Sequence, residues 1–135
     1  MSATHVRVRV GEEHYALPIE EVTEVSELPV RTPVPEAPST VLGVASLRGQ
    51  VIPVADRAAI LGVGRSEHPD RMVVAKVGGH RAGLAVDAVT DVGVLPTASE
   101  PAGGRHLAGA ALVEGDLVGL LAVGSVLDAI GGGRG

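Results

Sequence analysis

The 135-residue sequence has no cysteine, tryptophan or phenylalanine, and it has a single tyrosine. Without cysteine the chain can form neither a disulfide framework nor a thiolate site. Without aromatic side chains it lacks the stacking surfaces on which single-stranded nucleic acids bind. Its 11 lysines and arginines never form a run, and the formal net charge is −5. Because phosphate backbones bind to basic stripes, the sequence predicts no nucleic-acid partner.

Long apolar segments are also missing. No uninterrupted apolar run approaches the roughly 20 residues that a membrane-spanning helix needs. The first 11 residues include the alternating polar and apolar side chains of a strand and show no signal-peptide pattern. The sequence therefore predicts a cytoplasmic protein without direct membrane insertion.

Side chains that could carry catalysis or hold a metal are dispersed. The five histidines are scattered along the sequence, at His5, His14, His68, His80 and His106. No pair of them has the spacing of zinc ligands, and no glycine run matches a phosphate-binding loop. No serine lies in the sequence context of a nucleophile elbow. We therefore expect no metal, no cofactor and no enzymatic activity.

Glycine and proline, with 19 and 9 residues, are abundant, and the apolar residues are nearly all Val, Ala and Leu. This composition is typical of many short strands joined by turns, because β-branched valine favours pleated sheets. The length suits one domain, or two small lobes that share a core. A core of small side chains must interdigitate closely, so it should tolerate deletions poorly.

Alternating polar and apolar side chains predict two hairpins in the first half of the chain. Their strands are expected at His5–Val10, His14–Leu17, Val41–Leu47 and Val51–Ala55. Ile19, Val22 and Val25 are instead spaced three apart, which predicts a short helical turn entered at a proline and running into a strand. The proline-rich segment Leu28–Ser39 should be an extended connector outside any sheet.

The same pattern starts again 67 residues later. Residues 8–29 and 75–96 are identical at eight of 22 positions when they are aligned at this offset. An offset of 66 then aligns the hairpin glycines Gly49 and Gly115. Two copies of a five-strand unit imply an all-β fold of two small barrels. Because a lobe of about 60 residues is marginally stable alone, the two lobes should share an apolar seam.

The glycine- and charge-rich segment at the middle of the chain gives the expected boundaries. We predict a first lobe over residues 5–61, a linker over 62–70, a second lobe over 71–130 and a flexible tail over 131–135. Each strand of the first copy should have a counterpart 66 or 67 residues later, and the two lobes should have the same strand order.

The segment Gly43–Asp56 resembles the signature hairpin of CheW domains. Gly11–Tyr15 followed by Ile19–Val25 resembles the first hairpin of that family and the segment after it. Arg81–Val92 resembles the counterpart in the second lobe. The resemblance extends from about His5 to Ile130. It implies two SH3-like five-stranded β-barrels, accompanied by short helices.

The resemblance also implies a non-catalytic adaptor in chemotaxis-type signal transduction. Such a protein binds the regulatory domain of a CheA-type histidine kinase through one lobe, and the cytoplasmic tip of a chemoreceptor lies in the groove between the lobes. Two alternatives stay open: a CheW-like module of a non-chemotaxis kinase pathway, and a β-barrel ligand-binding module without a kinase partner. Ser46 stands where family members commonly carry Asn, a departure that bears on receptor specificity.

Matching positions carry the expected binding residues. Those for the receptor are Ile19, Val22, Glu24, Val25 and Arg48, and those for the kinase are Gly49, Gln50 and Val51. From the residues alone, the apolar stripe could equally face the core, and a hairpin arginine is usually solvated. Asp56 and Asp87 each follow a strand and are explained as helix N-caps. In the repeat, Arg48 corresponds to Glu114, so the two lobes differ in charge at the same hairpin.

Overall fold

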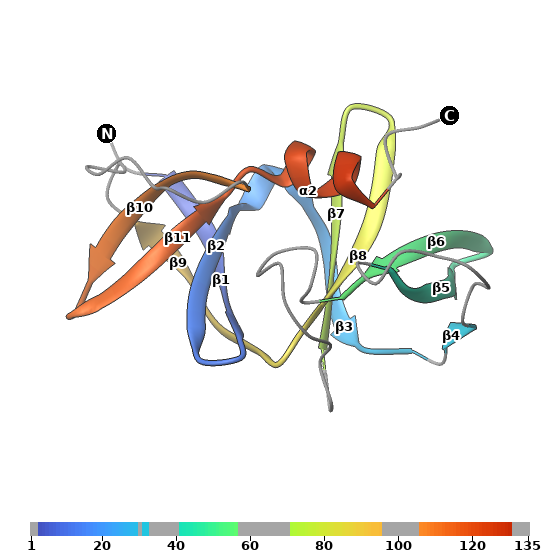
Figure 1. Cartoon of the computed structure of the whole chain (residues 1–135), viewed down its shortest axis with the longest axis horizontal. Helices are drawn as coiled ribbons and strands as arrows, with labels where there is room; N and C mark the ends of the chain where they lie inside the picture. The colour runs from blue at the N-terminus through green and yellow to red at the C-terminus, as the bar shows by residue number, and fades with distance from the viewer. Residues whose placement is uncertain (1–2, 30, 33–40, 57–70, 96–105, 131–135) are drawn as a thin grey trace.

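The computed structural model describes residues 3–29, 31–32, 41–56, 71–95 and 106–130 (Figure 1). Its elements, in chain order, are β1 (Ala3–Val10), β2 (Glu13–Pro18), the 3-10 turn η1 (Ile19–Glu21), β3 (Val22–Glu27), β4 (Arg31–Thr32), β5 (Val41–Leu47), β6 (Gln50–Ala55), β7 (Arg71–Val77), β8 (His80–Val86), β9 (Ala88–Leu95), β10 (Leu107–Val113), β11 (Asp116–Leu121) and helix α2 (Val123–Ala129). The all-β prediction is confirmed. The predicted helical turn is η1, and the helix expected after Asp56 lies outside the described residues.

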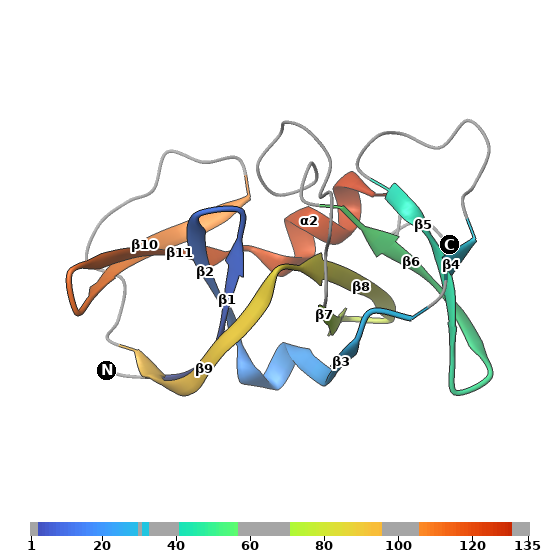
Figure 2. The same ribbon diagram turned by 90° about the horizontal axis from the view of Figure 1, so that it is seen from below.

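The strands form two sheets, which are the two lobes of the molecule (Figures 1 and 2). The first has the order β10-β11-β2-β1-β9 and the second the order β3-β7-β8-β6-β5-β4. Neighbours are antiparallel except for β11 beside β2 and β6 beside β8, which are parallel. Within the described residues no pairing joins the two edge strands of a sheet, so neither barrel is closed by a continuous hydrogen-bond ladder there.

The second sheet has one strand more than predicted because part of the proline-rich connector pairs with β5. Arg31 lies opposite Ala45, and Thr32 lies opposite Val44. Prolines occupy positions 29 and 33 on either side, and proline has no N–H to donate to a ladder. The strand β4 is accordingly only two residues long and lies at the edge of the sheet.

The predicted duplication is confirmed strand by strand. β1, β2 and β3 correspond to β7, β8 and β9 at an offset of 67, and β5 and β6 correspond to β10 and β11 at 66. When every strand is replaced by its counterpart, the order of one sheet becomes the order of the other, with β4 as an addition. The register shift between Arg7 and Val8 in β1/β9 recurs between Val22 and Glu24 in β3/β7.

The two lobes are nevertheless not the two halves of the sequence. The first sheet combines β1 and β2 from the first copy with β9, β10 and β11 from the second, and the second sheet makes the reciprocal exchange. The predicted division into lobes over 5–61 and 71–130 is therefore wrong as a description of the sheets. A repeat identifies which strands are equivalent, but pairing within a copy and pairing between copies produce the same sequence pattern. Residues 62–70 and 131–135 lie outside the described part.

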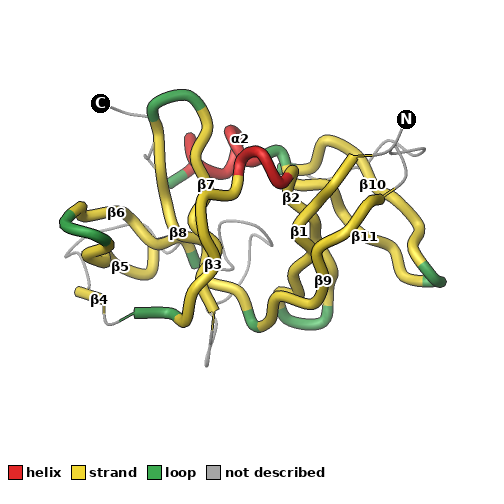
Figure 3. Tube along the Cα trace, turned by 180° about the vertical axis from the view of Figure 1, so that it is seen from behind, coloured by secondary structure: helices red, strands yellow, loops and turns green. Residues whose placement is uncertain are grey.

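The predicted apolar seam is confirmed as the largest core cluster. It joins Val8 and Leu17 of the first sheet to Val73 and Leu84 of the second, all at most 1% exposed. Helix α2 covers the junction of the sheets (Figures 1 and 3). It contributes residues to the same cluster, among them Val126. Each sheet buries its other face in a smaller cluster of its own. The seam therefore fixes the two lobes against each other.

Candidate functional site

The receptor-binding residues predicted between Ile19 and Val25 lie where the chain passes from one sheet to the other. Proline at position 18 ends β2, and η1 leads into β3 at the edge of the second sheet. Ile19 and Val25 are 41% and 42% exposed. Val22 is half-buried and packs against the shared core. The predicted stripe is thus divided between the surface and the seam.

Val22 is half-buried while Ile19 and Val25 are exposed because the chain changes from a helical turn to a strand within this segment. Residues 22–27 form a strand, in which burial alternates from one residue to the next. Val22, Glu24 and Ser26 are the more buried members, and Val25 faces outward. A spacing of three places two side chains on one face of a helix but on opposite faces of a strand. The helical pattern therefore ends with η1, and the exposed surface of this segment consists of Ile19, Val25 and the polar side chains between them.

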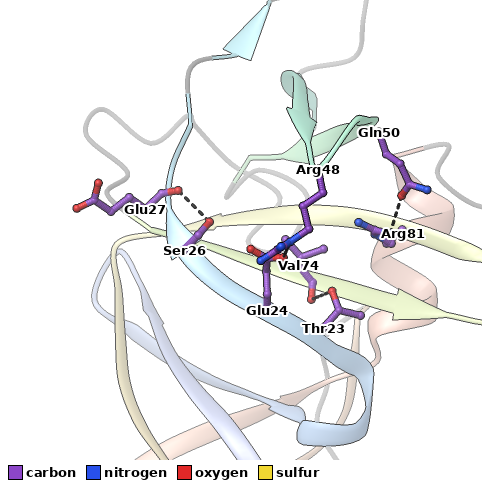
Figure 4. A network of polar contacts seen from close by, with 8 residues as sticks. All are labelled: Thr23, Glu24, Ser26, Glu27, Arg48, Gln50, Val74 and Arg81. Atoms are coloured by element: carbon purple, nitrogen blue, oxygen red, sulfur yellow. Dashed lines mark hydrogen bonds and ion pairs between the residues drawn. The ribbon is translucent and has the colours of Figure 1, made fainter.

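Glu24 and Arg48, both predicted to contact the receptor, are brought together by the fold. The Nε of Arg48 donates a hydrogen bond to Oε1 of Glu24 at 3.0 Å (Figure 4). The Arg48 side chain is 76% exposed and that of Glu24 is 24% exposed. An ion pair this exposed contributes at most about 1 kcal/mol. Its main effect is to orient the guanidinium and to connect the β5–β6 hairpin with β3.

The turn of the β5–β6 hairpin holds the predicted kinase-binding residues. Arg48 and Gly49 have φ angles of 50° and 80°, the left-handed conformations of a two-residue hairpin turn. Val51 is 70% exposed, so its apolar side chain faces solvent. The Oε1 of Gln50 accepts a hydrogen bond of 2.6 Å from Nη1 of Arg81 on β8 (Figure 4). We call Arg48, Gly49, Gln50 and Val51 the hairpin surface.

The segment beside the hairpin surface is acidic. Glu20 and Glu21 belong to η1, and Glu24 and Glu27 to β3. Burial raises the pKa of the Glu21 carboxyl, and the neighbouring charge of Glu20 raises it further. We call Ile19, Glu24 and Val25 the β3 surface; it is apolar at its ends and carries the ion pair to Arg48 at its centre.

The predicted N-cap at Asp87 is contradicted by the structure, and the one at Asp56 is not tested by it. Asp87 was expected to cap a helix, but β9 begins at the next residue. Its carboxylate instead accepts a hydrogen bond from the N–H of Gly11 in the β1–β2 turn. Asp56 is buried at the end of β6, and the residues after it are outside the described part. The prediction of an N-cap is therefore wrong for Asp87 and untested for Asp56.

Sequence reasoning did not select an apolar pair on the opposite hairpin. Leu112 and Leu117 face each other across β10 and β11 and are 66% and 64% exposed. The repeat aligns Leu117 with Val51, and this alignment was the available signal.

In the described part of the chain, no three His, Cys, Asp or Glu side chains are grouped closely enough to hold a metal ion. None of the helices in that part has both the length and the apolar character to span a bilayer.

Comparisons with known proteins agree with the geometry. The solved structure of the scaffolding protein TtCheW from Thermoanaerobacter tengcongensis superposes with a TM-score of 0.77 at 29% identity, covering 90% of this chain and 84% of that one. The chemotaxis protein CheW of Rhizobium meliloti (strain 1021) is 40% identical over 89 residues, which are 64% of this chain and 57% of that protein. This chain therefore matches little more than half the length of that relative.

Longer matches extend over most of the sequence. Protein FrzA of Myxococcus xanthus is 33% identical over 117 residues, which are 80% of this chain and 73% of FrzA. The model of the CheW-like domain matches residues 4–131. Together with the two-sheet fold, this match shows that the chain belongs to the family of CheW-like domains.

Proposed function

We propose that this protein is a scaffold that couples a CheA-type histidine kinase to chemoreceptors and carries out no catalysis itself. Its family supports this function, as does its likeness to a protein described as a scaffold. The observation that carries the proposal is the Arg48–Glu24 ion pair, because it connects the hairpin surface to the β3 surface. Both partners present their binding regions in the cytoplasm, so the proposal places the protein there.

The β3 surface is the proposed receptor site. Ile19 and Val25 are exposed apolar side chains on a segment that crosses between the lobes. An amphipathic helical tip can bury its apolar side chains against such a surface. The guanidinium of Arg48 has five N–H donors in a fixed plane, of which Nε–H is directed to Glu24. The others are available to carbonyl or carboxylate groups of the receptor.

Within the hairpin surface, Gly49, Gln50 and Val51 are the proposed kinase site, and Arg48 belongs to the receptor site. The apolar centre of the kinase site is Val51, and the turn before it has a conformation set by Gly49. The Gln50–Arg81 hydrogen bond holds the hairpin against β8, so the surface is presented by a supported turn. A small apolar centre with a polar border is typical of a protein-protein contact.

Replacing Gly49 by aspartate is expected to weaken binding of the kinase regulatory domain about tenfold while the fold is retained. Gly49 has φ +80° with no atom within 4 Å of an added Cβ, so the new side chain meets strain but no clash. The strain should cost about 1 kcal/mol. Isothermal titration calorimetry measures the affinity, and circular dichroism checks the fold.

Gly115→Asp is the matched control. Gly115 occupies the equivalent turn of the other sheet, with φ +88° and equally open surroundings. It should carry the same strain and leave kinase affinity unchanged. Equal losses of kinase affinity in Gly49→Asp and Gly115→Asp would mean that backbone strain causes the effect. Wild-type kinase affinity in Gly49→Asp would mean that the hairpin surface does not contact the kinase.

A further inference from the structure

Two cations of the second sheet face each other beside the proposed kinase site. Lys76 on β7 lies directly opposite Arg81 on β8. Like charges in directly opposed positions weaken a sheet unless an anion is close. In the described residues the ion pairs join other side chains, so neither Lys76 nor Arg81 has a carboxylate at ion-pair distance there. We call Lys76 and Arg81 the cation pair.

Arg81 links the cation pair to the β5–β6 hairpin. Its Nη1 donates the 2.6 Å hydrogen bond to Oε1 of Gln50, which lies on the neighbouring parallel strand β6 (Figure 4). An amide oxygen has no net charge, so this bond orients the guanidinium without neutralising it. A partner that is bound over Gly49, Gln50 and Val51 therefore meets an oriented and uncompensated cation next to Gln50.

The equivalent pair in the first sheet is used within the chain. At the offset of 67, the counterparts of Lys76 and Arg81 are Arg9 and His14, which also lie directly opposite each other. Arg9 is half-buried, and its Nη1 donates a hydrogen bond of 2.6 Å to the carbonyl oxygen of Gly11 in its own turn. Lys76 is exposed instead, and the described residues hold no acceptor for its ammonium group. Of the two equivalent pairs, the cation pair is thus the one that presents its charge outward.

We propose that the cation pair binds an aspartate or glutamate side chain of the kinase regulatory domain and so helps to determine which kinase the chain accepts. This contact rests on the proposed kinase site and extends it from the hairpin onto β7 and β8. The whole chain has a formal net charge of −5, so a local excess of positive charge attracts an acidic partner where the rest of the protein repels it. Charged groups at the border of a contact act mainly on specificity and on the association rate.

The receptor is a less suitable source of this carboxylate. Arg48, the cation of the proposed receptor site, is directed to Glu24 on β3, whereas Arg81 is directed to Gln50 on β6. Figure 4 shows these two contacts as separate groups. Receptor binding is therefore a second readout, and the cation pair should not affect it.

Charge reversal of each cation tests the contact by calorimetry with the kinase regulatory domain. Lys76→Glu and Arg81→Glu should each weaken kinase binding about tenfold and leave receptor binding unchanged. Added salt should weaken kinase binding of the wild type more than that of Lys76→Met, because the variant lacks one charge of the contact. Arg71→Glu is the matched control: Arg71 is exposed at the other end of β7, and its reversal changes the net charge equally. It should bind kinase normally, and circular dichroism should show that all variants are folded.

A second set of variants identifies the occupant. The aspartates and glutamates on the surface of the kinase regulatory domain are replaced by lysine one at a time. At least one of these domains should bind Lys76→Glu or Arg81→Glu more tightly than it binds the wild-type chain, because opposite charges then face each other again. If none does, the occupant is not a carboxylate of the kinase.

The contact and the proposed kinase site fail in different ways. A wild-type chain that does not bind the kinase regulatory domain would overturn both. The contact alone would be overturned if Gly49→Asp weakens kinase binding while both reversals bind as the wild type does. It would also be overturned if Arg71→Glu loses as much kinase affinity as the reversals do, or if the reversals weaken receptor binding instead.

Discussion

Replacing Leu84 by alanine is expected to lower the free energy of unfolding by about 2–5 kcal/mol. Leu84 lies on β8, is 1% exposed and belongs to the cluster shared by both sheets. The substitution removes three carbons and leaves a cavity that neighbouring side chains of this small-residue core are too short to fill. Urea unfolding followed by circular dichroism measures the change.

The same experiment tests the cooperativity of the lobes. Each sheet takes strands from both copies, and both bury one face in the same core cluster, so we expect them to unfold together. We therefore expect one transition for both the wild type and Leu84→Ala. Leu112→Ala is the control: its side chain is 66% exposed and should change stability by no more than about 0.5 kcal/mol. A shared core would be contradicted by two separate unfolding transitions. It would also be contradicted if Leu84→Ala lowered the free energy of unfolding by less than about 1 kcal/mol.

Val25→Lys is expected to weaken receptor binding about 30-fold or more while the melting temperature stays near that of the wild type. Val25 is 42% exposed on the edge strand β3, so lysine can extend into solvent in the free protein. In the complex the ammonium group would have to leave water without a partner, at a cost of roughly 2 kcal/mol. Surface plasmon resonance with a soluble receptor fragment measures the affinity.

Two further lysine variants make this result specific. Leu112→Lys places the same charge on an exposed apolar position of the β10–β11 hairpin, in the other sheet, and should bind receptor normally. Val22→Lys should lower stability, because Val22 packs on the shared core. Normal receptor binding by a folded Val25→Lys chain would mean that the β3 surface is not the receptor site.

The strands and turns were predicted well from the sequence because each of them occurs twice, once in each copy of the repeat. Gly49 and Gly115 do occupy equivalent left-handed turns, as their alignment indicated. The exchange of strands between copies could not be predicted from the same alignment. It depends on where the chain leaves each sheet after the first hairpin, and one crossover is made by the three residues of η1. Which strands pair is therefore decided by tertiary contacts and not by the local sequence pattern.

For the candidate site, residue identities were more predictable than their contacts. Glu24 and Arg48 were each selected by resemblance, but their ion pair depends on the curvature that brings a hairpin turn to an edge strand. The sequence analysis treated Ile19, Val22 and Val25 as one stripe with a spacing of three. The chain instead changes from a helical turn to a strand within this segment, so the three side chains do not share one face. Exposed Leu112 could have been inferred only from its position beside the equivalent turn.

The scaffold function is tested most directly by asking whether the chain recruits kinase to receptors. Receptor-containing vesicles are mixed with the kinase regulatory domain and sedimented with or without this protein. We expect kinase in the pellet only when the chain is present. Gly49→Asp should leave the chain in the pellet but reduce the kinase found there, and Val25→Lys should reduce the amounts of both in the pellet. Kinase that sediments equally without the chain, or a chain that never sediments with either partner, would contradict the proposed function.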